Sequence, residues 1–246
     1  MSLPKGGFIM KQLDMLYEGK AKKVYKTDDE DHYIVHYKDD ATALNGAKKG
    51  TIYDKGVFNN KITSFFFTLL KKNGIDNHFE KMINDRDQIV KKLQMLPLEV
   101  IVRNVVAGSM AKRLGREEGE VLIRPTVEFS LKSDPLDDPW INEYYAVSLG
   151  LATEEQVKEV IRQAFAVNDV LKPFLADKGV VLVDFKLEFG LFHGQVMLGD
   201  EISPDTCRFW DADTHEHLDK DRFRRDLGDV DGGYKEMLKR LTGEVL

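Results

Sequence analysis

Residues 181–190 read Val-Leu-Val-Asp-Phe-Lys-Leu-Glu-Phe-Gly, an apolar run that turns into an alternation of charged and apolar side chains. Successive side chains of a β-strand point to opposite faces, so Asp184, Lys186 and Glu188 should share one face. Residues 180–183 are apolar on both faces, which indicates that the strand enters a hydrophobic core. Charges at the end of such a strand require ion pairs, or a bound ion or substrate. We therefore interpret this face as functional, the alternative being the solvated face of a surface strand.

Two further carboxylates follow in Leu-Gly-Asp-Glu, residues 198–201. Glu188 and Asp200 together could hold Mg²⁺, which takes one or two protein carboxylates and leaves its other positions to water and nucleotide phosphates. Directly opposed residues of an antiparallel pair point to the same face. A two-residue turn at 193–194 would put Asp200 opposite Leu187, on the wrong face. We therefore predict a three-residue loop or a bulge near Gly199 that places on one face Asp184, Lys186, Glu188 and Asp200.

A basic segment, Tyr-Glu-Gly-Lys-Ala-Lys-Lys-Val-Tyr at residues 17–25, predicts a short hairpin around Gly19. A glycine lets the backbone approach a phosphate closely, and Lys20 and Lys22 point the same way along a strand. The segment matches neither of the common glycine-rich nucleotide motifs. A solvated edge strand fits the same residues.

Residues 96–109, LPLEVIVRNVVAGS, predict a buried strand that ends at Arg103, followed by a short helix that opens at Gly108 and Ser109. A helix start with a hydroxyl and a nearby guanidinium suits a phosphate. The alternative is an ion pair of Arg103 with a structural carboxylate, such as Glu99, and a plain N-cap at Ser109.

Residues 203–205, Ser-Pro-Asp, form a turn signal that would bring Arg208 close to Asp200. The alternative is a loop whose arginine covers Trp210. The six histidines show no metal-ligand spacing with the single cysteine, Cys207, to which we assign no role.

The composition is that of an ordinary globular protein: 246 residues, 42% hydrophobic and 32% charged, with a net charge of −6. No basic face of a nucleic-acid-binding protein is visible, and no apolar run approaches the ~20 residues of a membrane helix. A single cysteine excludes a disulfide within the chain and suits the cytoplasm. Residues 1–9 are interpreted as a leader or an alternative start.

The order of expected elements is strands, helix, strands, helix, hairpin and helices, which indicates an α+β fold. We expect a loop over residues 39–56, an N-cap at Asp54 for the first helix, and an interruption of the strands at residues 95–97. A capping box at Thr153 and Gln156 predicts a long helix that Pro173 should bend or shorten. The C-terminal part, from residue 220, should be helical and broken around residues 228–233.

Together these stretches resemble the SAICAR synthetase family (phosphoribosylaminoimidazole-succinocarboxamide synthases), in its short bacterial form. LPLEVIVRNVVAGS and VLVDFKLEFG look like its two diagnostic segments. YEGKAKKVY, KGVFNNKIT, NVVAGSMAKRLG, LGDEISPD and DKDRFR are also similar to that family, and the resemblance runs from about residue 13 to 241. Asn45 departs locally, because many members carry Asp there.

The resemblance implies a two-lobed α+β fold, similar to ATP-grasp enzymes and protein kinases, with the nucleotide between a β-rich lobe (residues 10–94) and a larger lobe (residues 95–246). It implies an ATP-dependent ligase of purine biosynthesis that joins carboxyaminoimidazole ribotide and L-aspartate, as a cytoplasmic homodimer with no nucleic-acid or membrane partner. The implied nucleotide and Mg²⁺ residues are Gly19, Lys20, Ala21, Lys22, Met95, Lys132, Glu188 and Asp200, the last two holding the metal. The implied ribotide residues are Arg103, Ser109 and Arg208 at its phosphate, and Asp184 and Lys186, the catalytic pair, at its imidazole and carboxylate.

Two other functions remain open from the residues. A kinase-like or ATP-grasp enzyme acting on another small phosphorylated acid would keep the lysines and the metal carboxylates, but would not need Arg103, Ser109 and Arg208 together. A regulatory nucleotide-binding module without turnover would not need Asp184 and Lys186 beside the metal site.

Overall fold

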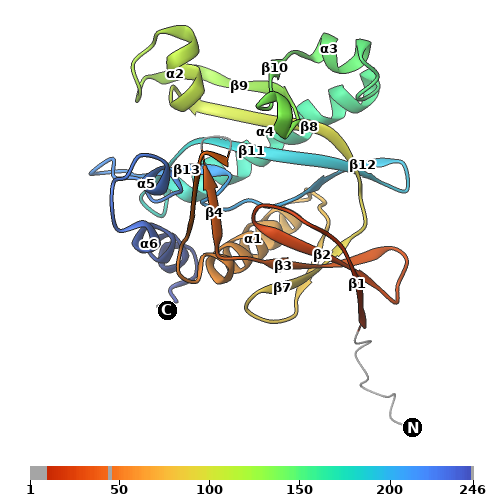
Figure 1. The fold of residues 1–246 in the computed structure, drawn as a ribbon. Coiled ribbons are helices and arrows are strands. Elements are labelled where there is room, and N and C mark those ends of the chain that lie inside the picture. Colours follow the sequence, from red (N-terminus) through yellow and green to blue (C-terminus); the bar gives the residue numbers. More distant parts are fainter. Residues whose placement is uncertain (1–9, 44–45, 245–246) are drawn as a thin grey trace.

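The computed structural model describes residues 10–43 and 46–244 of the chain. The expected leader, residues 1–9, and Asn45 lie outside the described residues. Two large antiparallel sheets, a separate two-stranded sheet and a set of helices make up the fold of the described residues (Figure 1). The α+β class expected from the sequence is confirmed.

The N-terminal sheet has five strands in the order β1-β2-β3-β7-β6. The hairpin around Gly19 opens it, and every neighbouring pair is antiparallel. Its small core is formed by Val24, Val35, Tyr37 and Val90. The strands are β1 (Gln12–Glu18), β2 (Lys22–Thr27), β3 (His32–Tyr37), β6 (Phe79–Met82) and β7 (Asp87–Lys91).

The second sheet has six strands, and β11 is its central strand. β11 pairs with β8 along one edge, while β13 and β12 share its other edge, β13 at the start of the strand and β12 at its end. The strands are β8 (Gln94–Val105), β9 (Val121–Leu131), β10 (Trp140–Ile141), β11 (Val180–Phe192), β12 (Gln195–Gly199) and β13 (Cys207–Asp211).

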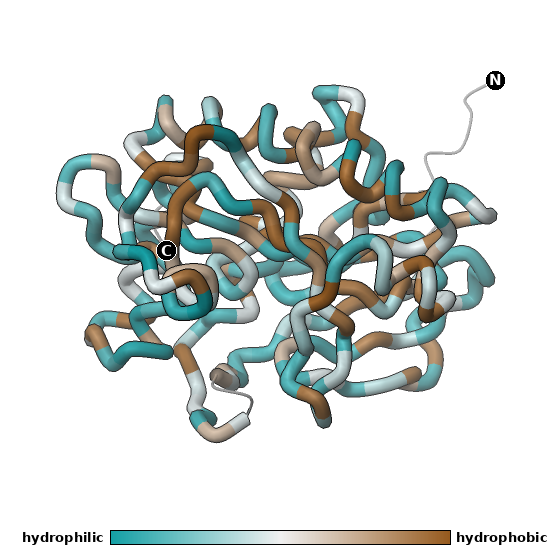
Figure 2. Tube along the Cα trace, turned by 90° about the horizontal axis from the view of Figure 1, so that it is seen from above, coloured by the Kyte–Doolittle hydropathy of each residue, from teal (hydrophilic) through white to brown (hydrophobic). Residues whose placement is uncertain are grey.

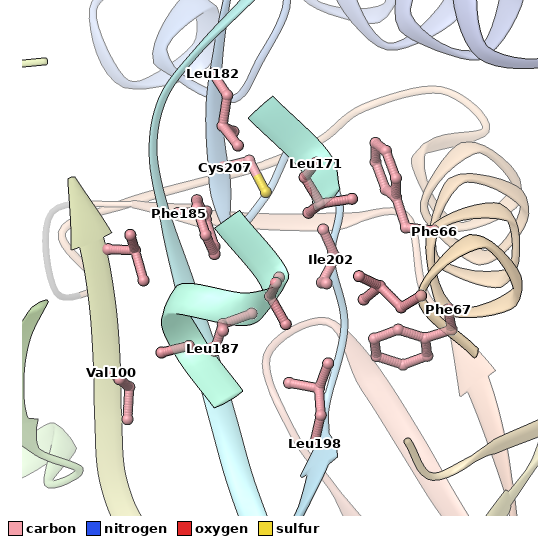
Figure 3. Packing of buried hydrophobic residues seen from close by; sticks show 14 of the residues in the cluster. Phe66, Phe67, Val100, Leu171, Leu182, Phe185, Leu187, Leu198, Ile202 and Cys207 are labelled. Atoms are coloured by element: carbon pink, nitrogen blue, oxygen red, sulfur yellow. The ribbon is translucent and has the colours of Figure 1, made fainter. Parts of the chain in front are cut away.

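The apolar face of β11 forms the centre of the main core. Phe185, Leu187 and Phe189 are at most 1% exposed. Figure 3 shows Phe185 and Leu187 beside Leu171 of α4 and Val100 of β8, with Phe66 and Phe67 of α1 completing the cluster. Because this face is filled by hydrophobic side chains, the charged residues of β11 must lie on the opposite face of the sheet. Seen from above, hydrophobic segments run through the middle of the molecule (Figure 2).

Two long helices pack on this core, and both begin close to the positions that the sequence indicates. α1 (Lys55–Lys72) and α4 (Glu154–Ala176) contribute most of the helical core residues. The capping box at Thr153 and Gln156 is confirmed, with both reciprocal hydrogen bonds present. Pro173 lies inside α4, which continues for three residues beyond it, so the shortening expected there is slight. The remaining helices are α2 (Gly108–Leu114), η2 (Asp134–Leu136), α3 (Glu143–Ser148), α5 (Asp221–Arg224) and α6 (Val230–Thr242).

The sequence predicted a loop over residues 39–56, and this prediction is wrong. The segment contains the two-stranded sheet of β4 (Asp40–Ala43) and β5 (Lys48–Thr51). Asp54 occupies the N-cap position of α1, as expected, but it has a left-handed backbone (φ 54°) and makes no side-chain capping bond. Its carboxylate instead accepts a hydrogen bond from Arg86 at 2.9 Å. A part-exposed ion pair thus replaces the capping hydrogen bond.

The interruption expected at residues 95–97 is absent, since β8 runs through Pro97. The pairing register explains how a strand tolerates this proline. Glu188 lies opposite Glu99, while Gly190 lies opposite Met95, so β8 has two extra residues across from Phe189. Such a bulge leaves residues outside the hydrogen-bond ladder, where a proline costs no bond.

The C-terminal break falls at residues 225–229, slightly earlier than expected, and Gly232 and Gly233 lie inside α6. Among the described residues, no helix combines the length and the apolar character that crossing a membrane requires.

Candidate active site

Asp184 lies between two arginines on the polar face of the six-stranded sheet. It is directly opposite Arg103 on β8 and directly opposite Arg208 on β13. Directly opposed residues point to the same face, and the contacts follow from that register. Arg103 Nη1 donates to Asp184 Oδ2 at 2.7 Å, and Arg208 Nη1 donates to the two carboxylate oxygens at 3.0 and 2.9 Å. Asp184 and Arg103 are 3% and 4% exposed, so one carboxylate fixes both guanidinium groups in a buried position.

Both arginines have further partners that hold them in place. Arg103 Nε donates to Glu128 of β9 at 3.0 Å, and its Nη2 donates to Ser109 Oγ at 2.9 Å. Arg208 Nε donates to Asp221 at 2.9 Å. Arg103 thus pairs with structural carboxylates, as the alternative held, but the partners are Glu128 and Asp184 and not Glu99. Ser109 is the second residue of α2, whose N-cap position is taken by Ala107, so its hydroxyl faces the guanidinium instead of capping the helix.

Gly108 makes this arrangement sterically possible. Its φ of +54° is a left-handed backbone conformation that side chains disfavour. A Cβ atom there would also lie 2.4 Å from Arg208 Nη2. The backbone at the start of α2 therefore packs directly on the guanidinium of Arg208.

Two residues beyond Asp184 on β11, Lys186 is surrounded by three carboxylates. It forms ion pairs with Glu188, with Glu99 at 3.4 Å and with Asp200 at 3.5 Å. Burial disfavours the charged lysine, but the attraction of Glu188, Asp200 and Glu99 outweighs it, and the pKa of Lys186 is raised well above its ordinary value. Lys186 is therefore a permanent cation here.

The predicted hairpin register is wrong, but the predicted meeting of the two carboxylates occurs. The turn has two residues, His193 and Gly194, both with positive φ, and Phe192 pairs with Gln195. Gly199, the last residue of β12, lies opposite Glu188. Asp200 follows the strand in a left-handed conformation (φ 56°), which turns its side chain to the polar face. The left-handed conformation of Asp200, and not a bulge, thus brings its carboxylate to the face that carries Lys186 and Glu188.

Lys22 of β2 joins this group from the N-terminal sheet. Its ammonium contacts Asp200 and lies 2.8 Å from Glu201 Oε1, and it sits 5.5 Å from the centre of the Tyr37 ring. Burial alone would raise the pKa of Asp200, but Lys22 and Lys186 lower it far below its ordinary range. Asp200 is therefore fully ionised and shared by two lysines from different sheets.

The other predicted nucleotide residues lie around this centre. Lys132 contacts Glu188, and its backbone N–H donates to the Pro97 carbonyl in the β8 bulge at 3.0 Å. Lys20, at the tip of the first hairpin, reaches across to Asp134 of η2 at 2.7 Å. Met95 is 40% exposed and packs beside Gly199, where an added Cβ would lie 3.6 Å from its sulfur. Gly19 and Ala21 flank Lys20, and Gly19 N–H donates to the Lys22 carbonyl to close the turn.

One cluster elsewhere has the geometry of a metal site. His217, Asp219 and Asp221 bring one ligand atom each within 4.8 Å of one another. The carboxylates are already used, because Asp219 accepts backbone N–H groups of Phe209 and Asp221, and Asp221 accepts Arg208 and Arg224. This cluster therefore supports the arginines and carries no metal assignment.

Comparison with known proteins identifies the family of this chain. A family model described as SAICAR synthetase matches residues 15–241. The phosphoribosylaminoimidazole-succinocarboxamide synthase of Clostridium kluyveri is 58% identical over 233 residues, which cover 95% of this chain and 99% of that relative. The chain belongs to the SAICAR synthetase family.

Solved structures of the family have the same fold. The phosphoribosylaminoimidazole-succinocarboxamide synthase from Ehrlichia chaffeensis has a TM-score of 0.92 at 40% identity, over 95% of this chain and all of that chain. A SAICAR synthetase in complex with ADP has a TM-score of 0.92 at 51% identity, over 95% of this chain and 99% of that one. The family resemblance expected from the sequence is thereby confirmed over nearly the whole chain.

Within this family fold, several supporting residues were not singled out from the sequence. Glu128, Asp221 and Glu201 hold the site's cations from β9, α5 and the turn after β12. His78 contacts the Asp200 carbonyl at 3.0 Å, and its burial lowers its pKa to about 4, so it is neutral. Glu128 could have been found from its alternation on β9, while the others depend on tertiary contacts between distant segments.

Proposed function

We propose that this chain is an ATP-dependent ligase of purine biosynthesis that joins carboxyaminoimidazole ribotide and L-aspartate. The products are the succinocarboxamide ribotide, ADP and phosphate. Membership of the SAICAR synthetase family supports the reaction class. The ADP bound to a 51% identical family member supports a nucleotide substrate.

The observation that carries the proposal is the distribution of charge along the polar face of β11. At the arginine end of this charged face, Asp184 is held by Arg103 and Arg208, and at its lysine end Lys186 is held by Glu188 and Asp200. Asp184 and Lys186 are two residues apart, about 7 Å along the strand at 3.3 Å per residue. A ribotide whose phosphate lies at the arginines can extend its carboxylate towards Lys186.

We assign the arginine end to the ribotide phosphate. Arg103, Ser109 and Arg208 are fixed before the substrate arrives, because each guanidinium is held by carboxylates on either side. Preorganised arginine groups favour phosphate by charge-assisted and bidentate hydrogen bonds. Asp184, whose oxygens already accept from both arginines, acts by positioning them, and we place it together with Lys186 at the imidazole and carboxylate of the substrate.

The lysine end is assigned to ATP. Gly19, Lys20, Ala21 and Lys22 cover the phosphates, Met95 lines the adenine pocket and Lys132 reaches the nucleotide. The support is that Lys22 contacts Asp200 and Lys132 contacts Glu188. We further propose that the nucleotide lies between a lobe of residues 10–94 and a lobe of residues 95–246.

Glu188 and Asp200 fit a Mg²⁺ ion. Both carboxylates already lie against one cation, the Lys186 ammonium, and both offer the hard oxygen ligands that Mg²⁺ prefers. We propose that these two residues hold the ion when ATP is bound. The metal would supply neutralisation of the phosphate charge.

The reaction proceeds through an acyl phosphate in this proposal. A carboxylate resists attack by an amine because its charge repels the nucleophile and oxide leaves poorly. Transfer of the γ-phosphoryl group of ATP to a carboxylate oxygen of the ribotide releases ADP and gives a mixed anhydride. The amine of aspartate then attacks the carbonyl carbon, phosphate leaves with the bonding electrons, and the amine loses a proton. Phosphoryl transfer requires mainly positioning and charge stabilisation, which Lys22 and Lys186 provide.

We also propose that the chain acts in the cytoplasm as a homodimer, as the family resemblance implies, with small-molecule partners only. Light scattering coupled to size-exclusion chromatography tests the dimer, which should elute at about twice the mass of the 28.1 kDa chain.

A phosphate-release assay tests the function. Release should require ATP, the ribotide and L-aspartate together, and mass spectrometry should find the succinocarboxamide product. Phosphate release without the ribotide and aspartate would contradict the ligase and indicate a simple ATPase. Release that depends on another phosphorylated acid would support the kinase-like alternative.

A further inference from the structure

A second group of cations surrounds Asp205, in the turn between β12 and β13, and is not used by the roles proposed so far. Lys55 of α1 and Lys220, the residue before α5, share the carboxylate of Asp205, at 2.6 and 3.6 Å. Tyr234 Oη also donates to Asp205 at 2.6 Å. Arg224 donates to the Asp205 carbonyl at 3.3 Å. Asp205 is therefore a buried anion with more cations around it than its charge balances.

The ion pairs around the site form alternating chains of cations and carboxylates. One chain links Arg224, Asp221, Arg208, Asp184, Arg103, Glu128 and Arg113, and the other links Lys55, Asp205 and Lys220. The first contains four cations and three carboxylates, and the second contains two cations and one carboxylate. Each chain thus has an excess of one positive charge, in a protein whose net charge is −6. One excess charge suits the ribotide phosphate, which leaves the other without a proposed ligand.

Lys220 is the member of the second group that a ligand can reach. The side chain of Lys55 is fully buried, whereas that of Lys220 is 12% exposed. Within the described residues, Nζ of Lys220 donates no hydrogen bond, and its contact with Asp205 is an ion pair at 3.6 Å. Burial, together with Lys55 and Arg224, lowers the pKa of Lys220, while Asp205 and Glu201 raise it. An additional anion would relieve this repulsion.

The turn that carries Asp205 fixes where this group lies. Ser203 Oγ accepts from the Asp205 N–H at 3.1 Å and donates to Glu201 at 2.6 Å, and Glu201 contacts Lys22. The Thr206 carbonyl accepts from the Lys186 N–H at 2.8 Å. The cations around Asp205 thus adjoin both the proposed phosphate lysine and the strand position where the reacting carboxylate is placed.

We propose that Lys220, with Arg224 beside it, binds a carboxylate of the amino-acid substrate, L-aspartate. This inference rests on the proposed ligase reaction. Aspartate carries two carboxylates and must bring its amine to the activated carboxylate near Lys186. A lysine on the neighbouring turn holds one carboxylate while the amine remains free to attack.

The experiment is steady-state kinetics of Lys220→Met with each substrate varied in turn. The KM for L-aspartate should rise about tenfold to hundredfold, the usual effect of losing a hydrogen bond between charged groups. The KM values for ATP and the ribotide should stay within about twofold. Lys235→Met is the matched control, since Lys235 is an exposed lysine on α6 that pairs with Asp231, and its kinetics should equal those of the wild type.

Several outcomes separate this inference from the reaction on which it rests. Wild-type enzyme that releases no phosphate in response to aspartate contradicts the ligase reaction itself. An active Lys220→Met variant with an unchanged aspartate KM overturns the role of Lys220 alone, and so does an equal rise of all three KM values, which would mean a structural role. If the methionine variant does not fold, Lys220→Arg keeps the charge and should show a smaller rise confined to aspartate, while no rise would overturn the proposal.

Discussion

Asp200 Oδ2 lies 3.5 Å from Lys186 Nζ, although the register of the β11–β12 hairpin alone would turn these two side chains to opposite faces. The left-handed backbone of Asp200 (φ 56°) resolves the conflict. The position therefore has two requirements, a carboxylate for the site and a residue that tolerates a positive φ. Asp and Asn are among the few side chains that accept this conformation.

The two requirements can be separated by substitution. Asp200→Asn and Asp200→Ala should both nearly abolish ATP-dependent turnover, and both should lose the stability that comes from pairing with Lys22 and Lys186. Asp200→Ala should be less stable than Asp200→Asn by a further ~1 kcal/mol, the cost of placing alanine in the left-handed conformation. Thermal unfolding and a turnover assay on both variants check this. Equal stability of the two variants would contradict the backbone argument.

Arg208→Ala should weaken ribotide binding by about tenfold to hundredfold, because a hydrogen bond to a charged group contributes roughly 1.5–3 kcal/mol. ATP binding should change little, since Arg208 pairs with Asp184 and Asp221, whereas Lys22 pairs with Asp200 and Glu201. Titration calorimetry with each ligand measures both effects.

Arg103→Ala should also weaken ribotide binding more than ATP binding, for the same reason. It should also destabilise the fold by about 3–5 kcal/mol, because it leaves buried carboxylates unpaired. Equal loss of both ligands would argue against a ribotide-phosphate site.

Lys22→Met should chiefly impair the use of ATP, raising its KM and lowering kcat, because the lysine supplies a point charge at the phosphates. Lys23→Met is a suitable control, since Lys23 is the next residue on the same strand and forms only a loose pair with Glu18 at 3.9 Å. Turnover measured over a range of ATP concentrations compares the two. An ATP dependence of Lys22→Met that matches the control would remove Lys22 from the site.

Activity should require Mg²⁺ or Mn²⁺ and should disappear in excess chelator, returning when the metal is restored. The reason is that Glu188 and Asp200 provide two carboxylate ligands, few enough that the nucleotide phosphates must complete the coordination. Circular dichroism should be unchanged by the chelator, because the two carboxylates are already paired with lysines. Full activity in excess chelator would contradict a metal-bridged nucleotide.

Asp221 should make the fold sensitive to acid. Burial raises its pKa, but Arg208 and Arg224 lower it further, to about 2. A carboxyl group whose pKa is lower in the folded state contributes stability above its unfolded pKa and loses it as the pH falls towards the folded value. Urea unfolding should therefore show wild type more stable than Asp221→Asn by roughly 2 kcal/mol at pH 7, with the gap closing between about pH 4 and pH 2. A gap independent of pH would contradict the pairing.

The sequence was most informative where residues only two or three positions apart determined the local structure. The alternation in residues 181–190 predicted the charged face of β11, because the apolar half of that alternation had to fill the core. The capping box of α4 was predicted for the same reason, since its two partners are three residues apart. Asp184, Lys186 and Glu188 accordingly lie on the polar face of β11, opposite the core.

The errors arose where local signals were overruled by distant contacts. Asp54 has the chemistry of an N-cap, but Arg86 from the β6–β7 turn binds its carboxylate. Pro97 has the chemistry of a strand breaker, but a bulge opposite Phe189 accommodates it. Asp200 contacts Lys22, which lies 178 residues away in sequence. No pattern within a short window contains these partners.

The two-residue turn after β11 determines which length changes the chain can tolerate. A residue inserted between Asp184 and Glu188 would exchange the two faces of the strand beyond it, burying a charge and exposing a phenylalanine. The same insertion at His193-Gly194 would fall at a surface tip after the last site residue of β11, where added residues are tolerated best. Deep insertional scanning of β11 should therefore find a sharp boundary, with no functional insertions before residue 190 and many at 193–194. A shift of a single residue along β11 therefore moves every later side chain of the strand to the other face.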